Sequence, residues 1–221
     1  MTPKSDVSRK CYGQLCTVST ALDVAGDRWT LLLLRELLGG PARFEELVDG
    51  LPGIARNLLS SRLKRLEEDG LVRRVEGGGQ LYALTDLGAG ARPALEELGF
   101  WGVRLTRVAP AVHARSIRAI AMALQAILSR AGAVLPSETS TLELDVDGEH
   151  IEVALGPSPT AIARLSVGAD ARLSVSRETI AKALLGGPFE DEEIVVESGD
   201  PTTGPALARS IRAPFERFAT T

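Results

Sequence analysis

The residue types that most often carry catalysis or bind metals are few in this 221-residue chain and lie far apart. Its two cysteines, Cys11 and Cys16, are five positions apart, and its two histidines are His113 and His150. A structural zinc site needs four ligands in closely spaced pairs, so these residues predict no metal site. No spacing marks out a nucleophile with a base and an orienting group. The sequence therefore predicts no enzyme, no metal and no cofactor.

A different chemistry is concentrated between residues 54 and 74, where basic side chains outnumber acidic ones by six to three. The whole chain has a net charge of −4, but residues 1–109 carry 15 basic and 14 acidic side chains, whereas residues 110–221 carry 10 and 15. A protein that is acidic overall can bind DNA when its positive charge is gathered on one face. The six basic residues are Arg56, Arg62, Lys64, Arg65, Arg73 and Arg74.

Residues 54–68 predict an amphipathic helix with one face suited to DNA. At 3.6 residues per turn, Leu59, Leu63 and Leu66 fall on one side, which must pack against other helices. On the other side, small hydroxyl residues would let the helix enter the major groove, and Asn and Arg could pair with adenine and guanine. Leu58 lies at the edge of this face, where periodicity does not account for it. The predicted DNA-binding residues are Arg56, Asn57, Ser60, Ser61, Lys64 and Arg65, with Arg73 and Arg74 meeting phosphate or the minor groove from the next strand. The alternative is an ordinary solvated face.

The elements around this helix are those of a winged helix. Three helices are predicted before it, at Thr17–Ala25, Arg28–Leu38 and Ala42–Val48, and Asp27 is a suitable N-cap for the second. Strands at 71–76 and 80–85, joined by Gly77–Gly79, follow it. A helical pattern then runs to about Val108, and Pro110 breaks it. We therefore predict two domains, residues 1–110 and 111–221.

Five separated stretches between residues 11 and 105 form a set: Cys16-Thr-Val, Gly26-Asp-Arg-Trp-Thr-Leu-Leu-Leu-Leu-Arg-Glu-Leu37, Arg43-Phe-Glu-Glu-Leu47, Leu59-Ser-Ser-Arg-Leu-Lys-Arg-Leu-Glu-Glu-Asp-Gly-Leu-Val72 and Tyr82-Ala-Leu-Thr-Asp-Leu-Gly88. Together they closely resemble HxlR-type bacterial transcription regulators, which are winged-helix relatives of the MarR proteins. The resemblance implies a homodimer, built largely from its N- and C-terminal helices, that binds a short inverted repeat in double-stranded DNA. The short triple-glycine wing departs from the family pattern, which puts wing contacts in doubt.

The resemblance also directs attention to Cys16 and to one apolar helix. Some HxlR-type regulators carry an oxidant- or electrophile-sensing thiol at the position of Cys16, which makes it a candidate redox sensor; the alternative is a buried structural cysteine in a dimer helix. An apolar stripe that we place outside the winged-helix core predicts a dimer interface. Its residues are Leu95, Leu98, Trp101 and Leu105.

The second half predicts a sheet covered by helices. We expect helices at Ala114–Ala131, 177–185 and 203–218 and strands near 162–167, 172–175 and 193–197. We also expect a hairpin of Leu142–Val146 and Ile151–Leu155 with one solvent-exposed face, because apolar and polar residues alternate along it. The stretch Leu173–Gly187, with the acidic strand, Gly199-Asp200 and closing helix after it, resembles a sterol carrier protein type 2 domain. That resemblance implies an apolar tunnel for a lipid-like molecule; the alternative is a solid core.

These observations predict an α+β protein and leave two functions open. In the first, the chain is a dimeric transcription regulator whose C-terminal domain binds an apolar effector. In the second, it is a lipid-binding or carrier protein, and its winged helix serves dimerisation or protein contacts. The longest aliphatic run, Leu31–Leu34, is far shorter than a membrane span, and residues 1–10 lack a signal-peptide pattern, so a cytoplasmic location without membrane contact is expected.

Overall fold

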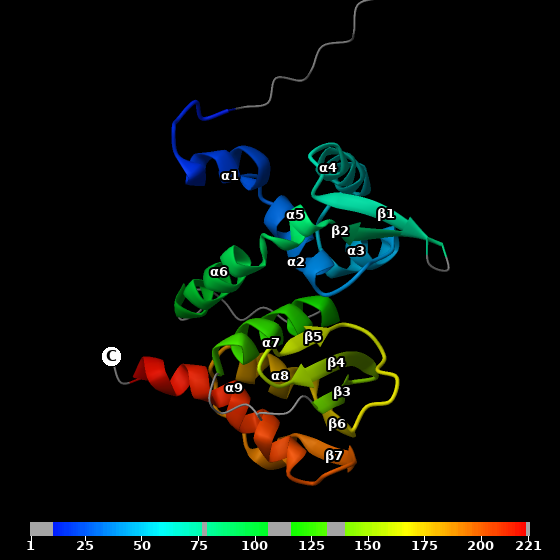
Figure 1. Ribbon diagram of the computed structural model, residues 1–221, viewed down its shortest axis with the longest axis vertical. Helices are drawn as coiled ribbons and strands as arrows, with labels where there is room; N and C mark the ends of the chain where they lie inside the picture. The colour runs from blue at the N-terminus through cyan, green and yellow to red at the C-terminus, as the bar shows by residue number, and fades with distance from the viewer. Residues whose placement is uncertain (1–10, 77–78, 106–115, 132–139, 220–221) are drawn as a thin grey trace, which may run out of the picture.

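Local sequence signals start and stop the helices of the first half. A computed structural model describes residues 11–76, 79–105, 116–131 and 140–219 (Figure 1). Asp27 accepts hydrogen bonds from the backbone N–H groups of Trp29 at 3.0 Å and Thr30 at 3.2 Å, so it satisfies N–H groups at the start of the second helix, although that helix begins at Thr30, two residues later than predicted, and Trp29 holds its N-cap position. The elements of this half are α1 (Thr17–Ala25), α2 (Thr30–Leu38), α3 (Phe44–Gly50), α4 (Arg56–Glu68), β1 (Val72–Glu76), β2 (Gln80–Leu84), α5 (Asp86–Ala89) and α6 (Arg92–Leu105).

The helical pattern after β2 forms two helices, α5 and α6, where the sequence predicted one. Thr85 caps α5, because its hydroxyl accepts a hydrogen bond from the N–H of Gly88 at 3.1 Å and donates one to the carbonyl of Gly70 at 2.6 Å. Gly88 lies so close to the chain that a Cβ there would be 2.1 Å from the carbonyl oxygen of Leu71. This close approach turns the chain from the β1–β2 ribbon into α6.

The winged-helix core is built from α2, α3, α4 and the ribbon. Leu59, Leu63 and Leu66 of α4 are buried as predicted, and Leu58 is half-buried at the edge of the same core. Ala42 extends the ribbon, because it exchanges backbone hydrogen bonds of 2.9 and 2.8 Å with Tyr82. Placing Leu95 outside this core was wrong: Leu95 is 6% exposed and belongs to it.

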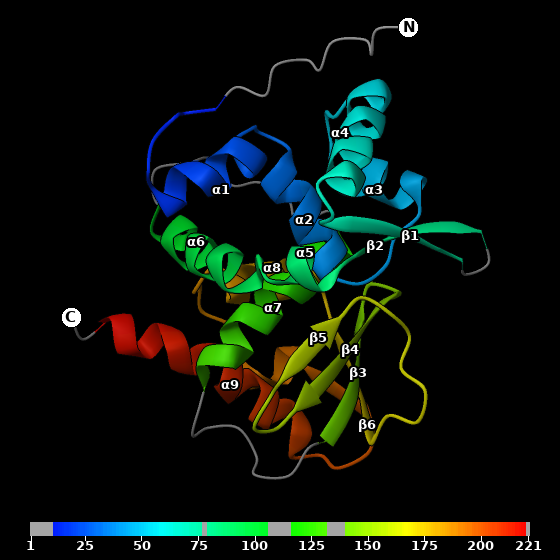
Figure 2. The same ribbon diagram turned by 45° about the horizontal axis from the view of Figure 1, so that its top comes forward.

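The second half is a five-stranded sheet with helices on one face. Its strand order is β5-β4-β3-β6-β7; only the β3–β6 pair is parallel, which confirms the predicted mostly antiparallel sheet. Figure 2 shows the strands β3 to β6 in front of the covering helices. The elements are α7 (Ile117–Ala131), β3 (Ser140–Val146), β4 (Glu149–Leu155), β5 (Thr160–Ile162), β6 (Ala171–Val175), α8 (Arg177–Leu184), a 3₁₀ turn (Asp191–Glu193), β7 (Val195–Ser198) and α9 (Thr203–Ala219).

Two details of the sheet differ from the prediction. The strand expected near Ile162–Val167 ends at Ile162, and the following residues form a loop. The face of the β3–β4 hairpin predicted to be wet is partly covered: Glu143 is 5% exposed, and its carboxylate accepts a hydrogen bond from the N–H of Ser166 in that loop. Alternating polar residues thus predicted the strand but not the loop that folds over it.

The helix α7 packs on both halves of the chain. Its residues Ile120, Leu124 and Ile127 belong to the core of the sheet, whereas Met122 belongs to the winged-helix core. At its start, the hydroxyl of Ser116 donates a hydrogen bond of 2.6 Å to the carboxylate of Glu36, a fully buried residue of α2. The predicted boundary at residue 110 lies outside the described residues, and α7, which begins at Ile117, packs on both cores.

Candidate nucleic-acid interface

The outer face of α4 is exposed and polar. Its apolar side holds it against α2 and α3, so the residues one half-turn away face solvent. In Figures 1 and 2, α4 and the β1–β2 ribbon lie next to each other on the right of the winged-helix half, and α4 projects away from the C-terminal sheet. Among the predicted DNA-binding residues of α4, Arg65 is half-buried; the exposed ones are Arg56, Asn57, Ser60, Ser61 and Lys64.

Arg56, in the first turn of α4, is held by α3. Its Nη1 donates a 2.7 Å hydrogen bond to Oε2 of Glu45, its Nη2 donates a second to Oε1, and its guanidinium lies 5.2 Å from the ring centroid of Phe44. This hydrogen-bonded pairing raises the pKa of Arg56 and lowers the pKa of Glu45. The pair fixes the direction of Arg56 at the exposed start of the helix, where a phosphate or base edge could replace the carboxylate.

Asn57 and Ser61 are partly occupied by their own helix. The side-chain oxygen of Asn57 accepts a hydrogen bond of 2.9 Å from the N–H of Leu58, and the hydroxyl of Ser61 donates one of 3.1 Å to the carbonyl of Leu58. The amide nitrogen of Asn57 takes no part in the first of these bonds, so it remains suited to a base acceptor. Lys64 lies 3.8 Å from Glu68, one turn further on.

Arg73 and Arg74 lie next to each other on β1 and are both exposed. Successive side chains of a strand point to opposite faces, so Arg73 and Arg74 point to different faces of the ribbon. Arg74 is on the side of α4, because its Nε donates a 2.6 Å hydrogen bond to Glu67, which belongs to that helix. Residues 77 and 78, at the tip of the predicted wing, lie outside the described residues.

Sequence reasoning missed the carboxylates that hold these cations. Glu45 holds Arg56, Glu67 holds Arg74, and Asp27 lies 3.4 Å from the half-buried Arg62. Burial acts to raise the pKa of Asp27, but hydrogen bonds from Thr30 and Trp29 and the charge of Arg62 together lower that pKa. The partners lie 7 to 35 positions apart, on other elements, and helix periodicity carries no signal for such pairs.

Metal-binding clusters and membrane-spanning helices are both absent from the part of the chain that the structure describes. Within residues 11–76, 79–105, 116–131 and 140–219, no group of three or more metal-ligating side chains is found; His113 lies outside these ranges. Over the same ranges, no helix has the length and apolar character needed to cross a membrane.

Comparison with known proteins assigns the first half. The HxlR-like helix-turn-helix family model matches residues 24–109. An uncharacterized HTH-type transcriptional regulator of Mycobacterium tuberculosis, Rv3095, is 42% identical over 102 residues, which cover 44% of this chain and 63% of that protein. The HTH-type transcriptional regulator YvaP of Bacillus subtilis, also named uncharacterized, is 39% identical over 90 residues, covering 37% of this chain and 79% of YvaP. The chain belongs to the HxlR-like family.

A solved structure of a MarR-family regulator from Enterococcus faecalis V583 is 34% identical, covers 41% of this chain and 86% of that one, and superposes with a TM-score of 0.36. The chain spans 63% of the length of the mycobacterial relatives that it matches. These relatives are named regulators and not enzymes, in agreement with the prediction from the residues. The HxlR-like match ends at residue 109, and the sterol-carrier likeness of the second half stays a prediction.

In the HxlR-like half, Cys16 is exposed and stands directly before α1. Hydrogen bonds from the backbone N–H groups of Ser19 and Val18 lower the pKa of the Cys16 thiol. This exposure is that of a single copy of the chain, so both the redox sensor and the cysteine buried in a dimer helix stay predictions. Cys11 is exposed too; its sulfur donates a hydrogen bond to Asp23 at 3.2 Å.

The apolar residues of α6 divide between the core and solvent. Leu98, Trp101 and Leu105 are 42%, 59% and 45% exposed, whereas Leu95 is buried. A second exposed apolar set lies on and just before α1: Tyr12, Leu15, Val18 and Leu22. Both helices lie on the left of the molecule in Figures 1 and 2, away from α4.

Proposed function

We propose that this chain is a dimeric DNA-binding transcription regulator of the HxlR-like family, with α4 as its recognition helix and an apolar small molecule as its effector. The observation that carries the proposal is the exposed polar face of α4, with Arg56 and Asn57 in its first turn. First-turn residues of a recognition helix are those that contact base edges in helix-turn-helix proteins. The names of the relatives support the same activity.

The test of DNA reading uses fluorescence anisotropy with a DNA fragment from upstream of the chain's own gene and a scrambled fragment. Arg56→Ala or Asn57→Ala should reduce the preference for the specific fragment by roughly 1–3 kcal/mol, the contribution of a bidentate base contact. Arg74→Ala should weaken binding to both fragments and reduce the salt slope by about one. Arg209→Ala, on the exposed side of α9, is the matched control and should change neither. If all three variants bind the specific fragment like the unchanged chain, α4 is not the reading helix.

The dimer proposal rests on the exposed apolar side chains of α1 and α6. A two-fold dimer would also place two copies of α4 about one DNA turn, ~34 Å, apart. Trp101→Asp should convert the dimer to a monomer in sedimentation equilibrium, because it would bury a charge in the interface. Leu165→Asp is the matched control, since Leu165 is equally exposed, at 59%, but lies in the loop after β5. A monomer at micromolar concentration for the unchanged chain, with and without DNA, would contradict the proposal.

Effector modulation is supported by the apolar second half and by its direct packing on the first. Arg118 of α7 donates hydrogen bonds to the carbonyls of Gly40 at 2.6 Å and Pro41 at 2.8 Å, and its Nη2 lies 3.3 Å from Glu46 of α3. The next helix after α3 is α4. A ligand that shifts α7 would therefore act on the elements that hold the recognition helix, and such coupling is typically worth 5–150-fold in affinity.

A further inference from the structure

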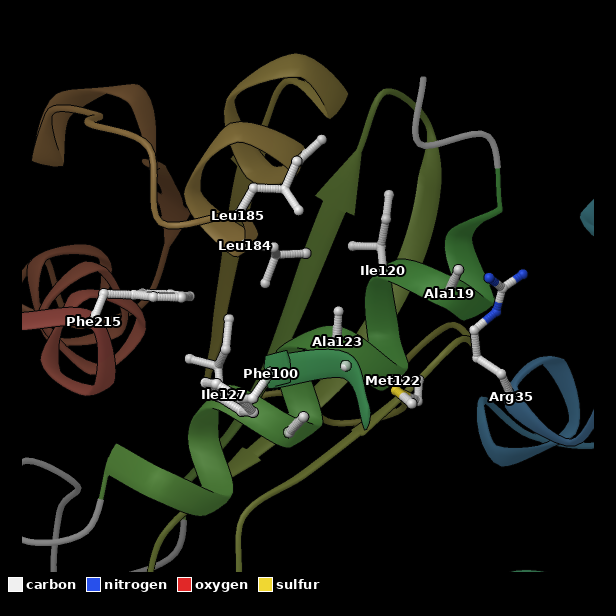
Figure 3. A pocket seen from close by; sticks show the side chains of 13 residues that line it. Arg35, Phe100, Ala119, Ile120, Met122, Ala123, Ile127, Leu184, Leu185 and Phe215 are labelled. Carbon is white, nitrogen blue, oxygen red and sulfur yellow. The ribbon is translucent and has the colours of Figure 1, made fainter. Parts of the chain in front are cut away.

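The described residues line a cavity, partly open to solvent, where the two halves meet. It has a volume of about 290 Å³ and lies between α6, α7, α8 and α9, with α2 at its rim; no strand residue lines it (Figure 3). The cavity is therefore distinct from a tunnel between sheet and helices, which the sterol-carrier resemblance implies. Its volume lies at the lower end of ligand pockets, roughly 300–1,000 Å³.

The walls of the cavity are apolar and partly aromatic. Phe100 of α6 and Phe215 of α9 stand on one side with ring centroids 6.2 Å apart, and Leu184 and Leu185 close the side formed by α8. The floor is α7, and Leu124 of this helix packs into the core of the sheet. The side chains of α7 that line the cavity are both small and large: Ala119, Ala123 and Ala126, with Ile120, Met122 and Ile127. These walls suit a compact, ring-containing apolar molecule.

Among the described residues that line the cavity, Arg35 has the one polar side chain, and Figure 3 shows its guanidinium at the rim, next to Ala119. Its Nε and Nη2 donate hydrogen bonds of 3.1 and 2.5 Å to Oε1 of the fully buried Glu36, so Nη1 lies outside this pair. Glu36 already balances the charge of Arg35. An anionic ligand would add a second, unbalanced negative charge beside the buried carboxylate of Glu36, which is costly, whereas a neutral oxygen acceptor would not.

We infer that this cavity binds a neutral, compact aromatic molecule that presents a carbonyl oxygen to Arg35, and that this ligand is the effector of the proposed function. The ligand would contact α7, which packs against both hydrophobic cores. It would also contact Arg35, whose partner Glu36 accepts a hydrogen bond from Ser116 at the start of α7. The binding part of the inference stands without DNA, so it can fail or hold independently of the regulator.

Three probes on one scaffold test the ligand class by calorimetry on the full chain. Benzophenone carries the carbonyl, diphenylmethane lacks it, and 4-benzoylbenzoate adds a carboxylate. Benzophenone should bind about tenfold more tightly than diphenylmethane, the effect of one hydrogen bond from a charged donor, and more tightly than the benzoate. Equal affinity for benzophenone and diphenylmethane would overturn the role of Arg35, and tighter binding of the benzoate would overturn the neutral class.

Two variants locate the site. Ala123→Leu fills the cavity and should abolish binding of benzophenone. Arg35→Met combined with Glu36→Gln removes both charges together, which avoids a buried unpaired carboxylate, and should remove only the advantage of benzophenone over diphenylmethane. Near-ultraviolet irradiation should then attach benzophenone to Met122 or Leu184 in the unchanged chain, as read by peptide mass spectrometry. Attachment of benzophenone to other residues would overturn the site. So would an affinity for benzophenone that falls as the protein concentration rises, because it would mean that a second copy of the chain fills the cavity.

The DNA titration separates the two proposals. Saturating benzophenone should change the affinity for the specific fragment by at least fivefold, at the low end of measured couplings. Intact DNA binding with no benzophenone binding would overturn the cavity and leave the regulator. Benzophenone binding without sequence-specific DNA binding would overturn the regulator and leave the cavity as a binding site. If the chain binds both, but benzophenone does not change the affinity for DNA, the effector role is overturned.

Discussion

The hydroxyl of Ser116 makes two bonds that a Ser116→Ala variant would lose together. It donates to the buried carboxylate of Glu36 at 2.6 Å, and it accepts from the N–H of Ala119 at 3.2 Å, which makes it the N-cap of α7. A hydrogen bond to a charged group contributes about 1.5–3 kcal/mol, and an N-cap contributes about 1 kcal/mol. We expect Ser116→Ala to lower the free energy of unfolding by about 3 kcal/mol and the midpoint of thermal unfolding by about 10 °C.

Urea denaturation followed by circular dichroism measures this change, with two controls. Ser116→Thr keeps a hydroxyl and should lose less than about 1 kcal/mol, and Ser60→Ala, on the exposed face of α4, should lose less than about 0.5 kcal/mol. A double-mutant cycle with Glu36→Gln isolates the bond between the halves from the cap. A loss under about 0.5 kcal/mol for Ser116→Ala would refute the assignment of stabilising bonds to this hydroxyl.

Three further predictions concern single sites. The pKa of Asp27 is lowered in the folded chain, so its carboxylate stabilises the fold fully above the ordinary pKa of about 3.9, and this stabilisation is lost as the pH falls through the lower folded pKa. The difference in free energy of unfolding between the unchanged chain and Asp27→Asn, measured by urea titration, should therefore shrink below about pH 4. A difference that stays constant from pH 7 to pH 2 would contradict this prediction. Cys16, with its lowered pKa, should react with iodoacetamide at neutral pH faster than glutathione does, as followed by mass spectrometry, and an equal or slower rate would argue against an activated thiol. Gly88→Ala should cost about 1–3 kcal/mol because its Cβ would meet the carbonyl of Leu71, while Gly102→Ala, with open space around it, should not destabilise the chain; equal effects in urea denaturation would count against the close approach.

The parts of the fold that the sequence predicted well are those set by nearby residues. Asp27 accepts hydrogen bonds from N–H groups at the start of α2, two and three positions on. Asp147 and Gly148, both with positive φ, make the two-residue turn that joins β3 to β4. The exposed face of α4 was predictable because Leu59, Leu63 and Leu66 repeat at helical spacing.

The parts that the sequence did not predict depend on distant partners. Glu36 has the sequence character of a surface residue, yet it is fully buried, where Arg35 pairs with it and Ser116, 80 positions later, donates to it. Leu95 and Leu98 have the same apolar character on one helix, and only the packing of α6 decides that the first joins the core and the second faces solvent. The cavity is likewise a product of five helices, and no single stretch of sequence contains its signal.

Because Met122 of α7 belongs to the winged-helix core, the second half of this chain cannot be replaced by another domain through a join between residues 105 and 116 alone. A hybrid made by fusing residues 1–110 to another C-terminal domain would leave the outer surface of α2, with the carboxylate of Glu36, without the helix that covers it. A transferable unit must instead carry Ser116, Arg118 and Met122 in register with α2. Natural recombination and laboratory chimaeras therefore meet the same constraint. The contact between the two halves runs along α7, so a hybrid must keep both the residues of α7 that pack on α2 and those that pack on the sheet.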